Sequence, residues 1–211
     1  MSRLRWIRRA AVGLIGIVAV PNLWVLVASG IALQLVGQSG VPESVSGIRN
    51  VAAVDDEVWR GGAPSDAEYR LLAQAGVEVV VDLRAEDDAP ESHAAARAAG
   101  LWVVHLPVRD GQPPTTYQIG RFVALVAAVE GPVYVHCGAG VGRTGAMAGA
   151  YLLRTGQASR PAAVARNLAV GPPSIEQLAF VGTGALEHPA WPLVAVSRVA
   201  DAPRRLWATL R

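Results

Sequence analysis

The chain has almost no cysteine: Cys137 is the only one in 211 residues. A single thiol excludes a disulfide framework within the chain and a zinc site built from several cysteines. The four histidines, His93, His105, His136 and His188, do not stand at the spacing of metal ligands. We therefore expect no bound metal and no other cofactor.

Charge is also scarce, at 17% of residues, and the formal net charge is only +2. The central part of the sequence contains no basic patch interleaved with aromatic residues, so no nucleic-acid partner is expected. No short internal repeat is present either, which argues against a solenoid. With 52% hydrophobic residues, the chain is long enough for one domain with a full core plus an appendage.

The single cysteine stands in the segment His-Cys-Gly-Ala-Gly-Val-Gly-Arg-Thr-Gly, residues 136–145. A short β-prone run, 133–135, precedes this segment, and a run of helical character, 146–153, follows it. Backbone amides at the start of a helix lack partners and bind anions. The sequence therefore predicts a phosphate-binding loop formed by Gly138, Ala139, Gly140, Val141, Gly142 and Arg143.

The residues beside this loop suggest nucleophilic catalysis at phosphorus. A thiol attacks as the thiolate, and the loop amides, the helix dipole and the guanidinium of Arg143 all favour the thiolate of Cys137. The planar fork of Arg143 suits two phosphoryl oxygens better than a lysine would. We expect Thr144 to donate its hydroxyl to the departing sulfur, and His136 to fix the loop through backbone hydrogen bonds.

The pattern His-Cys-x-x-Gly-x-x-Arg-Thr-Gly resembles the signature of cysteine-dependent protein tyrosine phosphatases, in particular their small bacterial dual-specificity-like members. The resemblance extends from Ile48 to Pro189, through residues 59–64, 80–84, 105–111 and 173–177. It implies a three-layer α/β domain with a central, mainly parallel sheet flanked by helices. It also implies a two-step, metal-free hydrolysis of phosphomonoesters through a phosphocysteine.

Some positions depart from that family pattern. Gly138 stands where many relatives have serine, and the Trp-Pro pair that precedes the acid in larger tyrosine phosphatases is missing. No tyrosine-containing loop for a deep phosphotyrosine slot is evident. A shallow pocket that also admits phosphoserine and phosphothreonine is therefore compatible with the sequence.

A general acid is needed to protonate the leaving oxygen, and Asp110 is the expected one. It lies in a turn-rich segment after the apolar run 102–106 and matches the place of the family's acid. Asp82, inside a β-like run, is expected to be structural, whereas Glu86 and its two acidic successors are expected to form a solvated loop. By the same resemblance, Gln177 is a candidate for positioning the hydrolytic water.

Strand and helix signals alternate along the middle of the chain, which favours a three-layer α/β domain. The expected strands are 57–60, 77–83, 102–106 and 133–135. The expected helices are 65–75, 90–99, 115–129, 146–153, 159–169 and one that starts at 174. Within the first strand, we expect Arg60 to have a structural role.

The N-terminal segment predicts a membrane anchor. Residues 10–36 carry no charge and exceed the roughly 20 residues needed to cross a bilayer. A cleaved signal peptide has a shorter apolar core, and a buried helix is the remaining alternative. The basic residues of 1–9 precede the span, so retention of positive charge in the cytoplasm predicts a single-pass protein whose catalytic domain is extracytoplasmic.

The remaining boundaries follow from composition. A polar linker is expected at 37–47, the phosphatase domain at 48–189 and a basic tail at 190–211. Four arginines give the tail its charge: Arg198, Arg204, Arg205 and Arg211. The tail is predicted to be either a solvated helix that covers the domain or a helix on an anionic membrane surface.

The sequence thus predicts a membrane-anchored phosphatase whose partners are a phosphorylated protein substrate and the membrane. Its substrates are phosphotyrosine and also phosphoserine or phosphothreonine esters. A phosphatase of phosphoinositides or other lipid headgroups is an alternative, although the loop supplies none of the lysines that polyphosphorylated rings attract. A non-catalytic phosphate-binding module is a further alternative, and sulfur transfer a more distant one.

Overall fold

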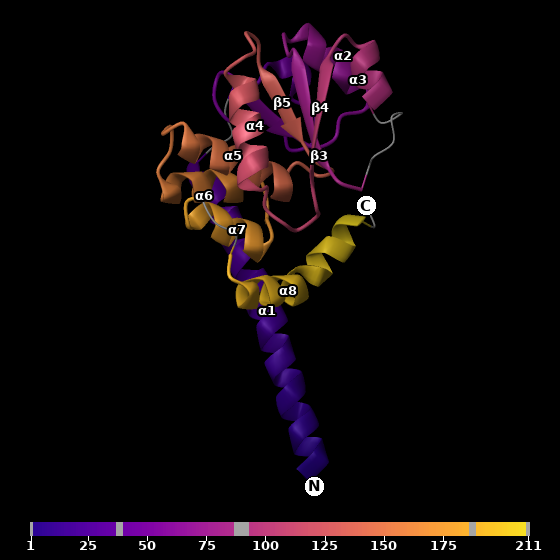
Figure 1. Cartoon of the computed structure of the whole chain (residues 1–211). Helices are drawn as coiled ribbons and strands as arrows, with labels where there is room; N and C mark the ends of the chain where they lie inside the picture. The colour runs from indigo at the N-terminus through magenta and orange to yellow at the C-terminus, as the bar shows by residue number, and fades with distance from the viewer. Residues whose placement is uncertain (1, 37–39, 87–92, 186–188, 210–211) are drawn as a thin grey trace.

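A computed structural model describes residues 2–36, 40–86, 93–185 and 189–209 (Figure 1). Within these residues the helices and strands alternate, as the sequence predicts. The elements are α1 (Ser2–Val36), the 3-10 turn η1 (Glu43–Val45), β1 (Ala52–Ala53), β2 (Val58–Gly61), α2 (Asp66–Gln74), β3 (Val79–Arg84), α3 (Ala94–Ala98), β4 (Trp102–Val108), α4 (Thr116–Val126), β5 (Val133–His136), α5 (Gly142–Arg154), α6 (Arg160–Leu168), α7 (Ile175–Gly182) and α8 (Trp191–Thr209).

The sheet has the strand order β1-β2-β5-β3-β4. The pairs β2–β5, β5–β3 and β3–β4 are parallel, and the edge strand β1 pairs antiparallel with β2. The sheet is therefore mixed, and its parallel part agrees with the prediction. The sequence did not predict β1, because two alanines carry no strand signal of their own.

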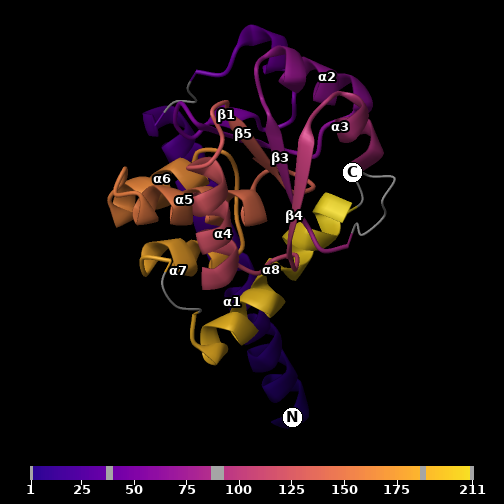
Figure 2. The same cartoon turned by 45° about the horizontal axis from the view of Figure 1, so that its top comes forward.

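Helices cover both faces of this sheet and produce three layers. Figure 2 shows α2 and α3 on one side, and α4, α5 and α6 on the other. The side chains of β3 alternate accordingly: Val79, Val81 and Leu83 join the core under α4 and α5, whereas Val80 joins the core under α2. A strand that is buried on both faces needs apolar residues at successive positions. This explains why β3 begins with three consecutive valines.

Capping residues fix where several helices begin. Ser65 and Glu68 form the capping box that the sequence predicts at the start of α2.

Two other helices differ from the predicted bounds. The helix α5 begins at Gly142, earlier than the expected 146, so Arg143 lies in its first turn. The expected helix at 90–99 is observed only as α3, and residues 87–92 lie outside the described part.

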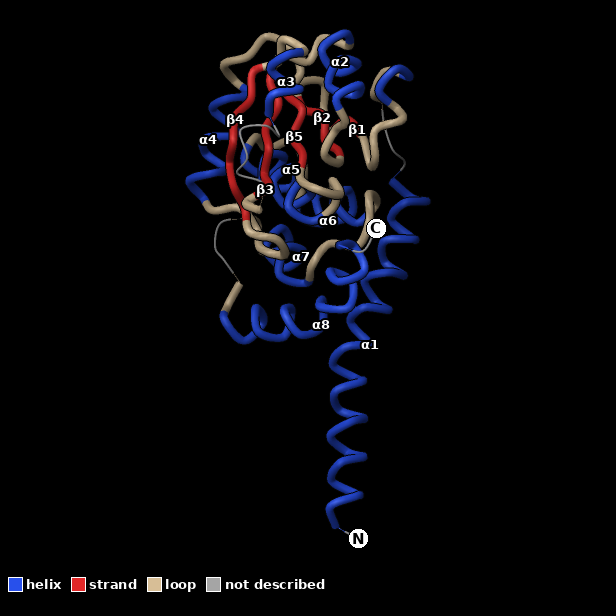
Figure 3. The backbone as a smooth tube through the Cα atoms, turned by 90° about the vertical axis from the view of Figure 1, so that its right-hand side faces the viewer, coloured by secondary structure: helices blue, strands red, loops and turns tan. Residues whose placement is uncertain are grey.

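The first helix projects away from the domain, with its N-terminal end farthest from the sheet (Figures 1 and 3). It runs without interruption through Pro21. Among the described residues, the segment Ile15–Val36 is the one helix long and apolar enough to cross a membrane. A stripe at helical spacing, Val25, Ser29 and Ala32, is buried, while most of the apolar side chains around this stripe are exposed.

The C-terminal helix α8 lies across α1 beneath the domain (Figure 3). Asn22 of α1 donates its side-chain N–H to the carbonyl of Ala200 in α8 at 2.6 Å. The buried stripe of α1 also meets Leu168 of α6 and Leu178 of α7 in one apolar cluster. The predicted anchor and the predicted tail therefore both pack onto the α/β domain and onto each other.

Candidate active site

The predicted phosphate-binding loop connects the end of β5 at His136 to the start of α5 at Gly142. Gly140, in the middle of this loop, has a φ of 75°. A Cβ atom at this position would lie 2.3 Å from the carbonyl carbon of Gly61 in β2. Only glycine allows the loop to pass this close to the neighbouring strand.

The carbonyl oxygens of the loop are bound by the scaffold beneath it. Arg60 Nη2 donates to the carbonyl of Gly140 at 2.7 Å, and Asn50 Nδ2 donates to that of Ala139 at 2.8 Å. In a trans peptide the following N–H points opposite to the carbonyl. The amides after these carbonyls therefore point away from the scaffold, which suits them to bind an anion. Arg60 is buried and has the structural role expected from the sequence.

A cavity of about 780 Å³ opens above the loop. Most of the predicted site residues line it: Cys137, Gly138, Ala139, Val141, Gly142, Arg143, Asp110 and Gln177. Cys137 is only 3% exposed, so its thiol sits at the floor of the cavity and not at its rim. The fold thus brings together residues from the loop after β5, from α5 and α7, and from the loop after β4.

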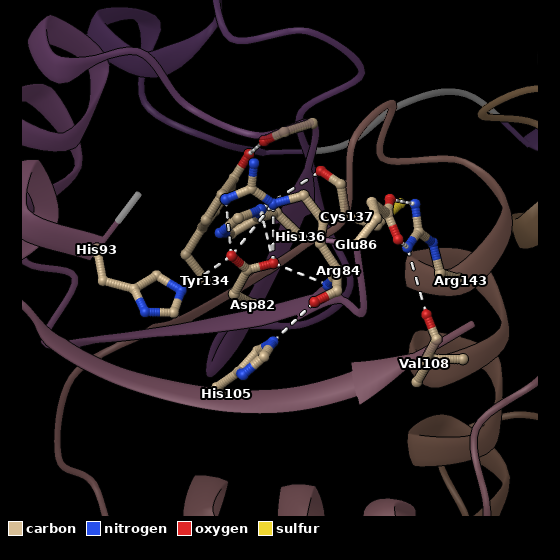
Figure 4. Close-up of polar contacts among 11 residues, drawn as sticks. Asp82, Arg84, Glu86, His93, His105, Val108, Tyr134, His136, Cys137 and Arg143 are labelled. Atoms are coloured by element: carbon tan, nitrogen blue, oxygen red, sulfur yellow. Dashed lines mark hydrogen bonds and ion pairs between the residues drawn. The ribbon is translucent and has the colours of Figure 1, made fainter. Parts of the chain in front are cut away.

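Arg143 is held in place by two groups that are distant from it in sequence (Figure 4). Its Nη1 and Nη2 donate to the two carboxylate oxygens of Glu86 at 2.6 Å each, and Nη1 also donates to the carbonyl of Val108 at 3.3 Å. These bonds use three of the five N–H donors of the guanidinium. The donors that remain, Nε–H and one on Nη2, form a fork suited to two phosphoryl oxygens.

The pair of Glu86 and Arg143 is ionised. Burial opposes the charge on Glu86, but the hydrogen bonds and the charge of Arg143 more than offset this and hold its pKa below the ordinary value. Burial likewise opposes the charge on Arg143, and Glu86 and Cys137 reverse that effect, so its pKa lies above the ordinary value. The arginine is a permanent cation.

Glu86 is an exposed loop residue, as expected, but the sequence did not predict its ion pair with Arg143. It lies directly beyond β3, and β3 is the parallel neighbour of β5 in the sheet. The carboxyl ends of adjacent parallel strands meet at one edge, so an acid after β3 reaches an arginine after β5. That adjacency is evident only from the strand order, which the sequence does not give. Asp87 and Asp88 lie outside the described residues.

Asp110 lies in the acid loop, defined here as residues 109–115 between β4 and α4. Its side chain is 50% exposed, and one carboxylate oxygen is 3.7 Å from Arg143 Nη2. The loop is held by α7: Ser174 Oγ donates to the carbonyl of Gly111 at 2.7 Å, and Gln177 Nε2 donates to that of Gln112 at 3.0 Å. The predicted acid therefore faces the same cavity as Cys137.

His136 is fully buried behind the loop, stacked on Tyr134 with ring centroids 5.9 Å apart. Its Nδ1 lies 3.3 Å from the carbonyl oxygen of Cys137. Burial, only partly opposed by the charge of Asp82, lowers its pKa to about 4. The imidazole is therefore neutral near pH 7, and it contacts the loop backbone as the sequence suggests.

Asp82 anchors a polar network below the loop (Figure 4). It accepts hydrogen bonds from Arg84, and its Oδ2 lies 3.1 Å from His93 Nε2. Although burial opposes its charge, the bonds from Arg84 and the nearby His136 lower its pKa to about 2. His105 Nε2 lies 2.7 Å from the carbonyl oxygen of Arg84. The carboxylate is structural, as expected.

Thr144 and Gln177 occupy contrasting positions. Thr144 is fully buried, and its hydroxyl has no hydrogen-bond partner among the described residues. Its role toward the departing sulfur stays a prediction. Gln177 is 1% exposed, and its amide already accepts from Ser174 N and donates to Gln112 O. The structure thus shows Gln177 holding the acid loop, and its role toward water stays a prediction.

Comparison with known proteins identifies the family. Residues 37–183, more than two thirds of the chain, match the family described as "DSP-PTPase phosphatase fused to NAD+ Kinase". The chain belongs to this family of protein tyrosine phosphatase type. Cys137, Arg143 and Asp110 all lie within the matched residues of the phosphatase.

Two relatives share part of the phosphatase sequence. NAD kinase 2, chloroplastic, of Arabidopsis thaliana is 35% identical over 95 residues, which are 42% of this chain and 10% of that protein. Dual specificity protein phosphatase 12 of Homo sapiens is 35% identical over 109 residues, or 49% of this chain and 31% of that protein. In both cases the similarity spans less than a third of the relative's length.

A solved structure confirms the fold of the phosphatase. P. aeruginosa TpbA has a TM-score of 0.56 and 21% sequence identity, and the match covers 78% of this chain and 96% of TpbA. At this identity the likeness concerns the architecture alone. The cavity, with its thiol, guanidinium and carboxylate, therefore has to support the function on its own geometry.

Proposed function

We propose that the protein is a membrane-anchored phosphatase that hydrolyses phosphotyrosine, and also phosphoserine or phosphothreonine, in protein substrates through a phosphocysteine. The observation that carries this proposal is the shared cavity. Cys137 lies at its floor, Arg143 presents a fork beside the thiol, and Asp110 faces it from the acid loop. These three groups supply the nucleophile, the phosphate-binding cation and the general acid of the proposed hydrolysis.

In the first step, the thiolate of Cys137 attacks phosphorus and the ester bond breaks. Loop amides and Arg143 bind the three non-bridging oxygens, where charge is held in the transition state. Asp110 gives its proton to the departing oxygen, which leaves as a neutral alcohol or phenol. In the second step, water gives a proton to Asp110 and attacks phosphorus. The sulfur then departs as a thiolate, aided by the Thr144 hydroxyl.

The charge of the cavity favours a protein substrate over a polyphosphorylated lipid. Three arginines line it, Arg49, Arg109 and Arg143, together with three acids, Glu86, Asp110 and Asp201. The chain contains no lysine, since its 19 basic residues are all arginine. A headgroup with several phosphates would require an excess of cations beyond those that bind the scissile group.

The membrane anchor in this proposal is α1. The support for this is its length, its lack of charge from 10 to 36 and the exposure of most of its apolar side chains. Because its arginines precede the span, we propose that the catalytic domain lies on the extracytoplasmic side. Protease added to intact cells is then expected to cleave near Arg49, and protection of the domain would reverse this orientation.

A substrate panel tests the activity. Full-length protein in detergent, with EDTA present, is assayed on phosphotyrosyl, phosphoseryl and phosphothreonyl peptides and on phosphoinositides. We expect turnover of the peptides, no loss with EDTA, and no turnover by Cys137→Ser. Turnover of phosphoinositides alone would establish the lipid alternative. Phosphate binding without turnover of any substrate would establish a binding module.

A further inference from the structure

The first turn of α7 receives two hydrogen-bond acceptors from the C-terminal helix α8. Ile175 N donates to Asp201 Oδ2 at 3.0 Å, and Glu176 N donates to Ser197 Oγ at 3.0 Å. The first amides of a helix have no partner within the helix. Ser174 caps the third one, Gln177 N, at 3.1 Å. Thus α8 binds two of the three amides that open α7.

The two acceptor side chains on α8 are buried and hydrogen-bonded to each other. Asp201 and Ser197 are each 2% exposed, and the Ser197 hydroxyl donates to Asp201 Oδ2. A buried carboxylate is costly unless donors surround it, and a negative charge at a helix N-terminus is favourable. The position of Asp201 is explained by the start of α7. The carbonyl of Ala200, the residue before Asp201, accepts from Asn22 of α1.

The same turn of α7 holds the acid loop. Ser174 Oγ and Gln177 Nε2 donate to the carbonyls of Gly111 and Gln112, the two residues that follow Asp110. Asp201 also lines the cavity that contains Cys137. Hydrogen bonds therefore join α8 to the first turn of α7, and other residues of that turn to the backbone beside the general acid.

We propose that Asp201 is a positioning residue for the general acid. By capping α7 from α8, it fixes Ser174 and Gln177, and these fix the acid loop so that Asp110 points at the leaving oxygen. The C-terminal helix lies beyond the residues matched by the phosphatase family. In this proposal it nevertheless contributes to catalysis, because it helps to position Asp110. This inference rests on the proposed function, because it assigns Asp201 a role in that reaction.

Leaving-group dependence tests the role of Asp201. A general acid contributes most when the leaving oxygen is strongly basic. Phenolate is more basic than 4-nitrophenolate, so displacement of Asp110 should slow the hydrolysis of phenyl phosphate more than that of 4-nitrophenyl phosphate. We expect Asp201→Ala to lower kcat on phenyl phosphate about tenfold and on 4-nitrophenyl phosphate less than about twofold. Asp201→Asn, which keeps an acceptor oxygen, should restore most of the loss. Equal loss on both esters, or none on either, would overturn the proposal.

A double variant separates positioning from general damage. In an Asp110→Ala background the acid is already absent, so adding Asp201→Ala should cause no further loss. A full additional tenfold loss would overturn the proposal. Val199→Thr, on the exposed side of the same helix, is the matched control and should behave as wild type. If Asp201→Ala does not fold, Ser197→Ala, which removes the acceptor of Glu176 N, carries the same comparison.

The outcomes distinguish this inference from the proposed function. A wild-type protein that hydrolyses neither ester contradicts the proposed function itself. A wild type that is active, with a leaving-group effect in Asp110→Ala but none in Asp201→Ala, contradicts only the positioning role. Thermal melts of each variant show whether α8 remains folded during the kinetic measurements.

Discussion

Glu86 and Arg143 are joined by two hydrogen bonds of 2.6 Å, one to each carboxylate oxygen. The contact ties the loop after β3 to the first turn of α5, so the guanidinium is oriented before any phosphate arrives. Glu86 takes one N–H of Nη1 and one of Nη2, so the Nε–H and the second N–H of Nη2 remain for a ligand on one edge of the guanidinium. The carboxylate therefore organises the anion site although it carries the same sign of charge as the substrate.

Replacement of Glu86 tests this orientation. We expect Glu86→Ala to weaken binding of vanadate, a phosphate stand-in, about fivefold, which is about 1 kcal/mol for a half-exposed charge pair. The reason is that a free guanidinium has to be ordered upon binding. Inhibition titrations against 4-nitrophenyl phosphate measure the effect. Tighter vanadate binding in Glu86→Ala would mean that the carboxylate competes with the ligand instead.

Replacement of Asp110 tests the identity of the acid. Asp110→Ala is expected to lower kcat on phenyl phosphate by about 100-fold or more, with a much smaller loss on 4-nitrophenyl phosphate. The nitrophenolate leaves without needing a proton. Steady-state kinetics on the two esters measure the difference. Equal losses on both would assign the proton transfer to another group.

His136 makes stability depend on pH. Its pKa is about 4 in the folded state and about 6.5 when unfolded, so the unfolded chain takes up the proton first as the pH falls. Protonation of His136 leaves the free energy of unfolding unchanged above about pH 6.5 and lowers it by about 3 kcal/mol by pH 4. Urea melts at pH 7 and pH 4 should show this loss in wild type and a smaller one in His136→Gln. The same loss in both proteins would place the titration elsewhere.

Gly140 is required by the close passage of the loop over β2. A Cβ at this position meets the backbone of Gly61, so Gly140→Ala should displace the loop amides and lower kcat/KM by about 100-fold. Gly156→Ala is the matched control, because Gly156 has a similar φ of 73° but a Cβ added there would meet nothing within 4 Å. Gly156→Ala should lose about 1–2 kcal/mol of stability through its φ alone, and Gly140→Ala should lose more because its Cβ also meets backbone. An active Gly140→Ala protein would show that the loop tolerates displacement.

The central part of the site could be predicted from the sequence because its chemistry is local. Cys137, the loop glycines and Arg143 follow one another along the chain, and their spacing alone indicates an anion site. The alternation of strands and helices was also predictable, since buried parallel strands and capped helices leave strong local patterns. Asp110 required the family resemblance as well, because an Asp-Gly turn is common in other settings.

The residues that organise the site were not predictable, because their partners are distant in sequence. Glu86 meets Arg143 across 57 positions, and Ser174 meets Gly111 across 63. No local pattern marks either contact, and Asp201 acquires its role only when α8 docks on α7. The strand β1 was missed for the same reason, since Ala52 and Ala53 are extended only through their pairing with β2.

The most direct test of the account is to trap the covalent intermediate. Wild-type protein is mixed with excess 4-nitrophenyl phosphate, quenched in acid within milliseconds, digested and mapped by mass spectrometry. The account predicts a phosphate adduct on Cys137, formed without metal and absent from Cys137→Ser. Turnover at the full rate in Cys137→Ser, or an adduct on any other residue, would contradict it.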